Sequence, residues 1–399
     1  MNNATLVLLG ISIILFIGFV GEWIFKKTKI PDILILIIIG FVIGPFGLKY
    51  VNPTNIASYA PIFTTFALLF LLYDGAFNID IKSLAKGALP SLKVTIFNFI
   101  LSAFFISLIM TIIGYGILLS ILTGFILGGI SSAFVIPLLK QLNPKPKTYS
   151  VLMLESAITD VLCIVFAFAI LEIITLQSFN LFDILKNIIS LFLVAGITGG
   201  IAGLIWIAIV ATLFREQKPY MITIAYLILL YVITEFIGGN GAIATLFFGL
   251  ILKNSRRITQ YITNSLNTRP KYVINAITPS EKFFNDQLSF FLKIFFFVYI
   301  GMLFDISDIT ILILGFSISV TIMIARRFTK LVTAEFDTQD QNLISSIFAR
   351  GLAAAAIAQV VLSSGIEGAE GVVAITYSVI VFSIILSSIS IFVSVRKKG

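Results

Sequence analysis

The sequence predicts an all-α polytopic membrane protein with about thirteen transmembrane helices, inverted-topology repeats and two interrupted helices. Its 399 residues are 59% hydrophobic and 12% charged, whereas soluble domains carry about a quarter charged residues. The mean hydropathy is +1.09. Apolar runs of roughly 20 residues, the length that crosses a bilayer as a helix, recur along the chain. Little sequence remains for an aqueous regulatory domain, so we expect a single membrane domain over residues 1–399.

Charge and turn clusters divide the apolar sequence into thirteen candidate spans. The first begins near Thr5 with no basic segment before it, which favours a retained helix over a cleaved signal peptide. We expect the spans at residues 4–25, 33–48, 59–79, 89–113, 117–139, 150–175, 183–213, 219–237, 239–252, 287–304, 308–333, 342–364 and 371–395.

Basic residues alternate between the loops and predict the orientation. Loops after odd-numbered spans hold twenty of the 27 Lys and Arg residues, at 26–29, 82–86, 140–147, 215–218, 253–282, 330 and 396–398. Loops after even-numbered spans hold chiefly Lys49 and Lys186. Because basic loops stay in the cytoplasm, we expect a multi-pass protein of the cell membrane with its N-terminus outside and its C-terminus inside.

Two segments seven spans apart resemble each other. The third span ends FLLYDGAFNIDI from Phe70, and the tenth carries FFVYIGMLFDI from Phe296. An odd separation makes the two copies enter the membrane from opposite sides, as in the inverted repeats of secondary transporters. We therefore expect repeats over 1–175 and 219–399, joined by a helix at 183–213.

Charged residues deep in the spans are the candidates for function, because each costs at least about 2.5–3.5 kcal/mol in hydrocarbon. Lys293 lies near a span end, where snorkelling accounts for it. In the sixth span, Glu155, Ser156, Thr159 and Asp160 fall within about 140° of one helix face. This span therefore combines one polar face with an otherwise apolar surface.

Asp160 lies about ten residues, or about 15 Å, from the cytoplasmic end of its span, in the middle of the hydrocarbon. A carboxylate there can carry a proton, bind a cation, or do both. Desolvation favours its protonated form, whereas a bound Na⁺ favours its ionised form. We therefore expect the two ions to compete for Asp160, with Ser156 and Thr159 as neighbouring ligands.

Three other deep charges extend this picture. Glu155 and Arg350 lie at similar depth, so we expect them to form a buried ion pair with a structural role. Asp74 in the third span could add a second carboxylate to the site, since hard cations prefer oxygen ligands. Arg326 and Arg327 lie in the eleventh span, and their pattern predicts no role.

The fifth and twelfth spans, again seven apart, are rich in small residues. The fifth contains Gly128, Gly129, Ser131 and Ser132, and the twelfth has Gly351 followed by four alanines from Ala353. Transporter sites are often built from two interrupted helices whose freed backbone groups line the site. We expect these spans to cross at the ion site, with both serines as candidate ligands; simple close packing by small residues is the alternative.

Several of these segments together resemble the monovalent cation:proton antiporter superfamily, in particular its thirteen-helix archaeal and bacterial sodium/proton antiporters. The resemblance covers most of the chain. It rests on PDILILIIIGFVIGPFGL from Pro31, LLYDGAFNID from Leu71, GGISSA from Gly128, ESAITD from Glu155, FFFVYIGM from Phe295 and ARGLAAA from Ala349.

The resemblance implies exchange of Na⁺ for H⁺ by an elevator form of alternating access in a homodimer. It makes Asp160 the ion-binding and proton-carrying residue, Ser156 and Asp74 further ligands, and Glu155 with Arg350 a supporting pair. Two departures matter. Thr159 stands where electroneutral members usually have Asn and electrogenic members Asp, which favours 1:1 exchange. The threonine-aspartate-proline break of the sodium exchangers is absent at residues 133–135, which resemble the potassium efflux branch.

Other functions fit the sequence less well. A K⁺/H⁺ antiporter or potassium efflux system is the nearest alternative, and Li⁺ transport also stays open. An intramembrane aspartyl protease would need a GxGD motif, but Asp160 follows Ile158 and Thr159. We therefore expect no enzyme and no cofactor beyond the transported ions. Basic residues form short clusters between spans, so the net charge of +8 predicts topology and lipid contact, not nucleic-acid binding.

Overall fold

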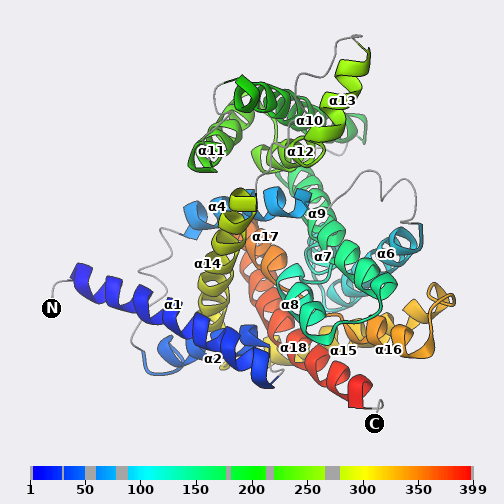
Figure 1. Cartoon of the computed structure of the whole chain (residues 1–399). Coiled ribbons are helices and arrows are strands. Elements are labelled where there is room, and N and C mark those ends of the chain that lie inside the picture. The colour runs from blue at the N-terminus through cyan, green and yellow to red at the C-terminus, as the bar shows by residue number, and fades with distance from the viewer. Residues whose placement is uncertain are drawn as a thin grey trace. The chain divides into compact units, whose positions relative to one another are not determined.

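The computed structural model describes residues 3–28, 31–49, 60–77, 89–176, 181–212, 220–265 and 279–396. These ranges are helical and contain no β-strand (Figure 1). The helices are α1 (Asn3–Thr28), α2 (Asp32–Ile43), α4 (Ala60–Phe77), α6 (Leu89–Ile112), α7 (Ile117–Ile126), α8 (Ser132–Leu142), α9 (Pro146–Leu176), α10 (Leu181–Thr212), α11 (Tyr220–Phe236), α12 (Gly241–Lys253), α13 (Ser255–Ser265), α14 (Pro279–Leu303), α15 (Ile309–Arg327), the 3-10 helix η1 (Phe328–Leu331), α16 (Thr338–Ser346), α17 (Leu352–Ser363) and α18 (Ala369–Arg396).

The all-helical fold is confirmed, and each of the thirteen predicted spans coincides with a helix or with an interrupted pair of helices. The pair α7 and α8 and the pair α16 and α17 each form one interrupted span, and α13 falls between spans. Six helices of the described ranges are long and apolar enough to cross a membrane, namely α6, α9, α10, α14, α15 and α18. Some predicted loop residues lie outside the described residues: Lys29, Lys82, Lys86, Arg215, Lys218, Arg269, Lys271, Lys397, Lys398 and the end of the run from Phe70.

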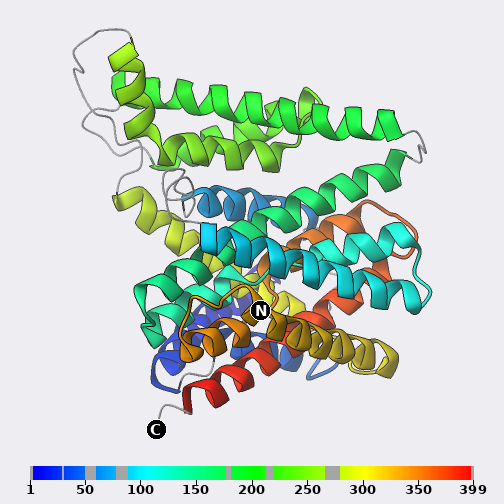
Figure 2. The same cartoon turned by 90° about the vertical axis from the view of Figure 1, so that its right-hand side faces the viewer.

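The helices form two compact units. The first comprises Met1–Thr64, Ala88–Ile174 and Phe290–Gly399, and the second comprises Thr65–Gly87 and Thr175–Ser289. In the second unit α12 packs against both α10 and α11, and Figure 2 shows α10 and α12 running along each other. A Cβ atom on Gly199 would lie 2.2 Å from the carbonyl oxygen of Ala244, so the two backbones meet directly.

In the first unit, α18 packs against α15, α17 and α16, while α6 packs against α7 and α15. A second cluster joins α1, α2 and the later part of α14. The Gly40 backbone of α2 approaches α14 so closely that an added Cβ would lie 2.0 Å from the carbonyl oxygen of Val298. Glycines on membrane helices permit this contact because no side chain separates the backbones.

A buried ion pair closes the same cluster. The Lys293 ammonium on α14 donates a 2.6 Å hydrogen bond to the Asp32 carboxylate at the start of α2. Both side chains are buried, so the prediction that Lys293 snorkels toward water is wrong. The two charges satisfy each other inside the unit because residues 32 and 293, far apart in sequence, meet where α2 packs on α14.

Candidate functional site

Two helix interruptions meet at the centre of the first unit. The first separates α7, ending at Ile126, from α8, and the second separates α16, ending at Ser346, from α17. Gly128, Gly129 and Gly351 fall in these breaks, and glycine is a poor helix former. The Ser131 amide donates a 2.9 Å hydrogen bond to the Ala349 carbonyl. The prediction that the fifth and twelfth spans are interrupted and cross is therefore confirmed.

The crossing is tight because one of the two backbones lacks a side chain at the contact. A Cβ atom added to Gly351 would lie 2.0 Å from the Ser131 hydroxyl oxygen and 2.5 Å from its Cβ. Beside this contact, the buried Arg350 guanidinium donates from Nη1 to the Gly129 carbonyl in the other interruption. A cation at this position offsets the partial negative charge of carbonyls freed by the break.

Helix α18 satisfies the backbone groups that the second interruption frees. The Ser383 hydroxyl accepts a 3.0 Å hydrogen bond from the Arg350 amide. The Ser387 hydroxyl accepts from the Phe348 amide at 3.2 Å and donates to the Ser346 carbonyl at 2.8 Å. Buried backbone groups without partners are costly in a membrane. These two serines therefore fix the shape of the interruption.

Asp160 on α9 lies against the first interruption. The hydroxyl of Ser132, the first residue of α8, donates a 2.5 Å hydrogen bond to its carboxylate. The carboxylate thus sits at a helix N-terminus, where free amides and the helix dipole favour negative charge. The hydroxyl of the preceding residue, Thr159, accepts a 3.2 Å hydrogen bond from the Ile130 amide. The ion-carrying candidate and the broken backbone therefore form one polar cluster.

The other predicted ligands differ in their placement. The Ser156 hydroxyl donates to the Met153 carbonyl of its own helix at 3.0 Å. The Ser131 hydroxyl is buried and has no hydrogen-bond partner among the residues that the structure describes. Asp74 is half-buried on α4 in the second unit, whereas Asp160 belongs to the first. Its membership of the ion site stays a prediction.

The pairing predicted for Glu155 is wrong in its partner. The Glu155 carboxylate is bound by both terminal nitrogens of Arg326 on α15, with Nη2 at 2.8 Å from Oε2. Arg350 instead donates to Gly129. Glu155 and Arg350 lie at similar depth along their spans, but depth alone does not determine the direction in which a side chain points.

Two polar residues without a predicted role complete the Glu155 cluster. The Asn98 amide on α6 donates to the Glu155 carboxylate at 2.9 Å, and the Thr329 hydroxyl on η1 donates to the Asn98 carbonyl oxygen at 2.6 Å. Asn98 could have been found from the sequence, because a polar amide within the long apolar run of the fourth span indicates a buried hydrogen-bonding partner. Arg326 and Asn98 thus both donate to the buried carboxylate, and Thr329 holds Asn98 in place; a buried ion pair requires such additional hydrogen bonds.

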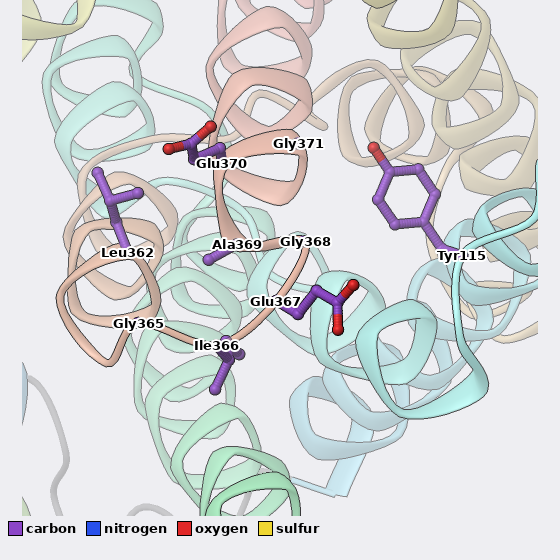
Figure 3. A pocket seen from close by; sticks show the side chains of 9 residues that line it. All are labelled: Tyr115, Leu362, Gly365, Ile366, Glu367, Gly368, Ala369, Glu370 and Gly371. Atoms are coloured by element: carbon purple, nitrogen blue, oxygen red, sulfur yellow. The ribbon is translucent and has the colours of Figure 1, made fainter.

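A cavity of about 510 Å³ lies elsewhere in the first unit, between the α6–α7 turn and the start of α18 (Figure 3). Tyr115, Glu367 and Glu370 line it, and the two carboxylates extend in different directions. Divergent carboxylates do not converge on one cation. Asp160 and its neighbours are absent from the cavity lining, so we locate the candidate ion site by its polar side chains.

Comparisons with known proteins agree with this geometry. The family model described as "Sodium/hydrogen exchanger, transmembrane" matches residues 11–397. The chain is 25% identical to Na(+)/H(+) antiporter 1 of Methanocaldococcus jannaschii over 73% of this chain and 67% of that protein. It is 21% identical to K(+)/H(+) antiporter NhaP2 of Shewanella oneidensis over 93% of this chain and 63% of that protein.

A solved structure shares the fold. The sodium proton antiporter MjNhaP1 from Methanocaldococcus jannaschii, determined at pH 8, superposes with a TM-score of 0.76 at 20% sequence identity. The superposition covers 99% of this chain and 97% of that one. The overall helical fold is therefore one already seen in a solved structure.

Proposed function

Because the chain belongs to the transmembrane sodium/hydrogen exchanger family, we propose that it exchanges Na⁺ for H⁺ across the membrane, with both ions competing for Asp160. The observation that carries this proposal is the Asp160 carboxylate at the start of α8, hydrogen-bonded to Ser132 at 2.5 Å. Na⁺ and a proton both bind a carboxylate oxygen, and one excludes the other. Transport of either ion then follows from the same residue facing alternate sides of the membrane.

The residues around Asp160 define a plausible ligand set for a hard cation, since such ions take oxygen ligands. The Ser132 hydroxyl already contacts the carboxylate, and the Thr159, Ser156 and Ser131 hydroxyls lie in the same segments. Asp74 stays a candidate for a further ligand on the evidence of the sequence alone. Arg326 holds the charge of Glu155, which leaves Asp160 as the carboxylate free to change its occupant.

Exchange in which Asp160 alone gains and loses the proton is electroneutral, with a 1:1 stoichiometry. Asp160 with Na⁺ bound and Asp160 with a proton bound carry the same net charge, and the neighbouring Thr159 does not titrate. Reorientation of either form therefore moves no net charge across the membrane. We further propose that this movement is of the elevator form and takes place in a homodimer. The chain is proposed to contain inverted repeats at 1–175 and 219–399. It is proposed to lie in the cell membrane with its C-terminus in the cytoplasm.

Proteoliposomes with an internal pH dye test the exchange. Adding Na⁺ outside should change the internal pH, and the Asp160→Asn protein should lose the response because its amide neither exchanges a proton nor neutralises Na⁺. Asp286→Asn, an exposed acid on α14, serves as the matched control and should retain exchange. Exchange that persists in Asp160→Asn would refute the mechanism, and a strong effect of membrane potential would refute 1:1 stoichiometry.

K⁺/H⁺ exchange is the second candidate, since residues 133–135 read Ala-Phe-Val and a relative with similar identity is named for K⁺. The same vesicles with K⁺ or Li⁺ in place of Na⁺ decide between the cations. A larger response to K⁺ than to Na⁺ at equal concentration would replace sodium as the proposed substrate while leaving Asp160 as the carrier.

A further inference from the structure

A short polar helix follows directly on one of the apolar helices of the second unit. Helix α13, with the sequence SRRITQYITNS, begins one residue after α12 ends at Lys253. Asn254, the one residue between the two helices, bonds to both: its amide donates to the Leu250 carbonyl, and its carbonyl accepts from the Arg257 and Ile258 amides. Asn254 and Ser255 are buried, so the junction is well fixed.

The direction of α13 suits the surface of a bilayer. Figures 1 and 2 both show α13 leaving α12 at a steep angle. Helix α12 is a predicted span, and α13 begins next to its C-terminal end, at Lys253. If α12 crosses a bilayer, α13 therefore lies at the level of the lipid headgroups and at a steep angle to the axis of α12. Amphipathic helices bind membranes in this orientation.

The sequence of α13 is amphipathic at helical spacing. Ile258, Tyr261 and Ile262 recur in the sequence at positions i, i+3 and i+4, a spacing that predicts one apolar face. Arg256 and Gln260 fall on the opposite side, and the structure shows both as exposed. An apolar face beside a basic one is typical of a helix that lies at a lipid interface.

The charged residues on both sides of α13 in the sequence have one sign. Residues 236–280 contain no Asp or Glu, and they contain Lys253, Arg256, Arg257, Arg269 and Lys271. Lys253 and both arginines of α13 are exposed, and Arg257 also contacts the protein itself. A stretch of 45 residues with five basic residues and no acidic one is complementary to an anionic partner. Arginine in particular matches the geometry of phosphate oxygens.

We propose that α13, together with Lys253, binds the phosphate headgroups of anionic phospholipids at the membrane surface. The apolar face of α13 enters the interface, and Lys253, Arg256 and Arg257 contact the headgroup phosphates. The proposal goes beyond the exchange reaction and does not depend on which ions the chain carries. It gives the second unit a lipid contact that is set by charge, in addition to the apolar contact of its spans.

Native mass spectrometry of the full-length protein tests the proposal, with phosphatidylglycerol as the anionic lipid and phosphatidylcholine as the neutral one. The natural protein should retain phosphatidylglycerol in preference to phosphatidylcholine. Lys253→Gln/Arg256→Gln should retain it roughly tenfold less or worse, the loss implied by two basic residues at an anionic surface. Lys253→Arg/Arg256→Lys should keep the preference, because the charge is unchanged.

The matched control removes two exposed basic residues from the first unit, Lys140→Gln/Lys330→Gln, and should retain the lipid. Equal retention in the α13 variant and the natural protein would overturn the proposal. So would equal loss in the control, since binding would then follow total charge. The single variant Arg256→Gln, expected to lose part of the binding, provides the test if the double variant does not fold.

Thermal unfolding in detergent distinguishes a lipid from a free anion. Added phosphatidylglycerol should raise the unfolding temperature of the natural protein, and high salt should reduce that gain because it screens surface charge. Inorganic phosphate at the same concentration should give no gain, and an equal gain would overturn the assignment to lipid.

Discussion

The amide of Ser131 donates a 2.9 Å hydrogen bond to the carbonyl of Ala349 and thereby joins the two interrupted helices at their breaks. This contact requires the backbones to approach more closely than side chains permit, and Gly351 provides the space. Asp160, Ser132 and Arg350 all lie within or beside these breaks. The geometry of the proposed ion site therefore depends on a backbone contact as much as on its charged side chains.

Gly351→Ala should disrupt exchange by separating the two breaks. The new Cβ would meet the Ser131 side chain at 2.0 Å from its hydroxyl oxygen, closer than atoms can approach, so one backbone must move. A proteoliposome assay should show strongly reduced exchange, and adding Ser131→Gly should restore part of it by removing the obstructing side chain. Gly200→Ala, where an added Cβ meets nothing within 4 Å, is the matched control.

Ser132→Ala should weaken ion binding more than it affects folding. The variant loses the hydroxyl that contacts Asp160 at 2.5 Å, and hydrogen bonds to charged groups contribute about 1.5–3 kcal/mol. We expect the Na⁺ concentration for half-maximal exchange to rise roughly tenfold or more. Ser363→Ala, whose hydroxyl bonds only to its own helix, should leave this value unchanged. An unchanged value in Ser132→Ala would exclude a ligand-supporting role for Ser132.

The spans and their interruptions could be predicted from the sequence because the bilayer imposes a fixed helix length and excludes unpaired backbone. Long apolar runs such as residues 150–175 therefore map onto single helices such as α9. Gly128, Gly129 and Gly351 likewise indicated the breaks, because glycine destabilises a helix and usually marks a structural feature where it occurs within an apolar run. The position of Asp160 beside the first break followed from its depth and from the polar face of its helix.

The partners within the site could not be predicted in the same way. Arg326 and Arg350 both lie near the depth of Glu155, and only the packing of α15 against α6 and α18 determines which one reaches it. Ser383 and Ser387 gave no signal, because serines in apolar helices usually bond to their own backbone. Asp32 and Lys293 are 261 residues apart, so their pairing depends on tertiary structure alone.

A double-mutant cycle should separate the observed pairing from the one that the sequence suggested. Arg326→Gln leaves a buried carboxylate without its partner, which should cost about 3–5 kcal/mol of unfolding free energy. Combining it with Glu155→Gln should cost clearly less than the sum of the two single changes, because the charge left alone is gone. The free energies can be measured by denaturant unfolding of the purified protein.

The cycle of Glu155→Gln with Arg350→Gln is the internal control. These side chains do not share the direct contact that Arg326 makes, so their effects should be much closer to additive. A stronger coupling of Glu155 with Arg350 than with Arg326 would contradict the structure and return the pair to the one expected from depth.

The last prediction concerns pH and the loops that precede α9 and α16. Lys145 contacts Asp337 directly and lies 3.7 Å from Asp340. The hydrogen bond from Lys145, together with its positive charge, lowers the pKa of Asp337 below its ordinary 3.8. The hydrogen bond to Asp337 and the negative charge of that carboxylate raise the pKa of Lys145 above its ordinary 10.5. The contact is therefore fully present between these two ordinary values and weakens outside them.

Thermal unfolding of the natural protein and of Asp337→Asn should thus differ by a constant, small amount from pH 9 down to pH 5. Below the ordinary pKa of 3.8 the difference should shrink, because protonation of Asp337 removes the same charge that the substitution removes. The difference should also fall with added salt, since both side chains are largely exposed to water. A difference as large at pH 3 as at pH 7 would show that Asp337 stabilises the loop through its shape and not through its charge.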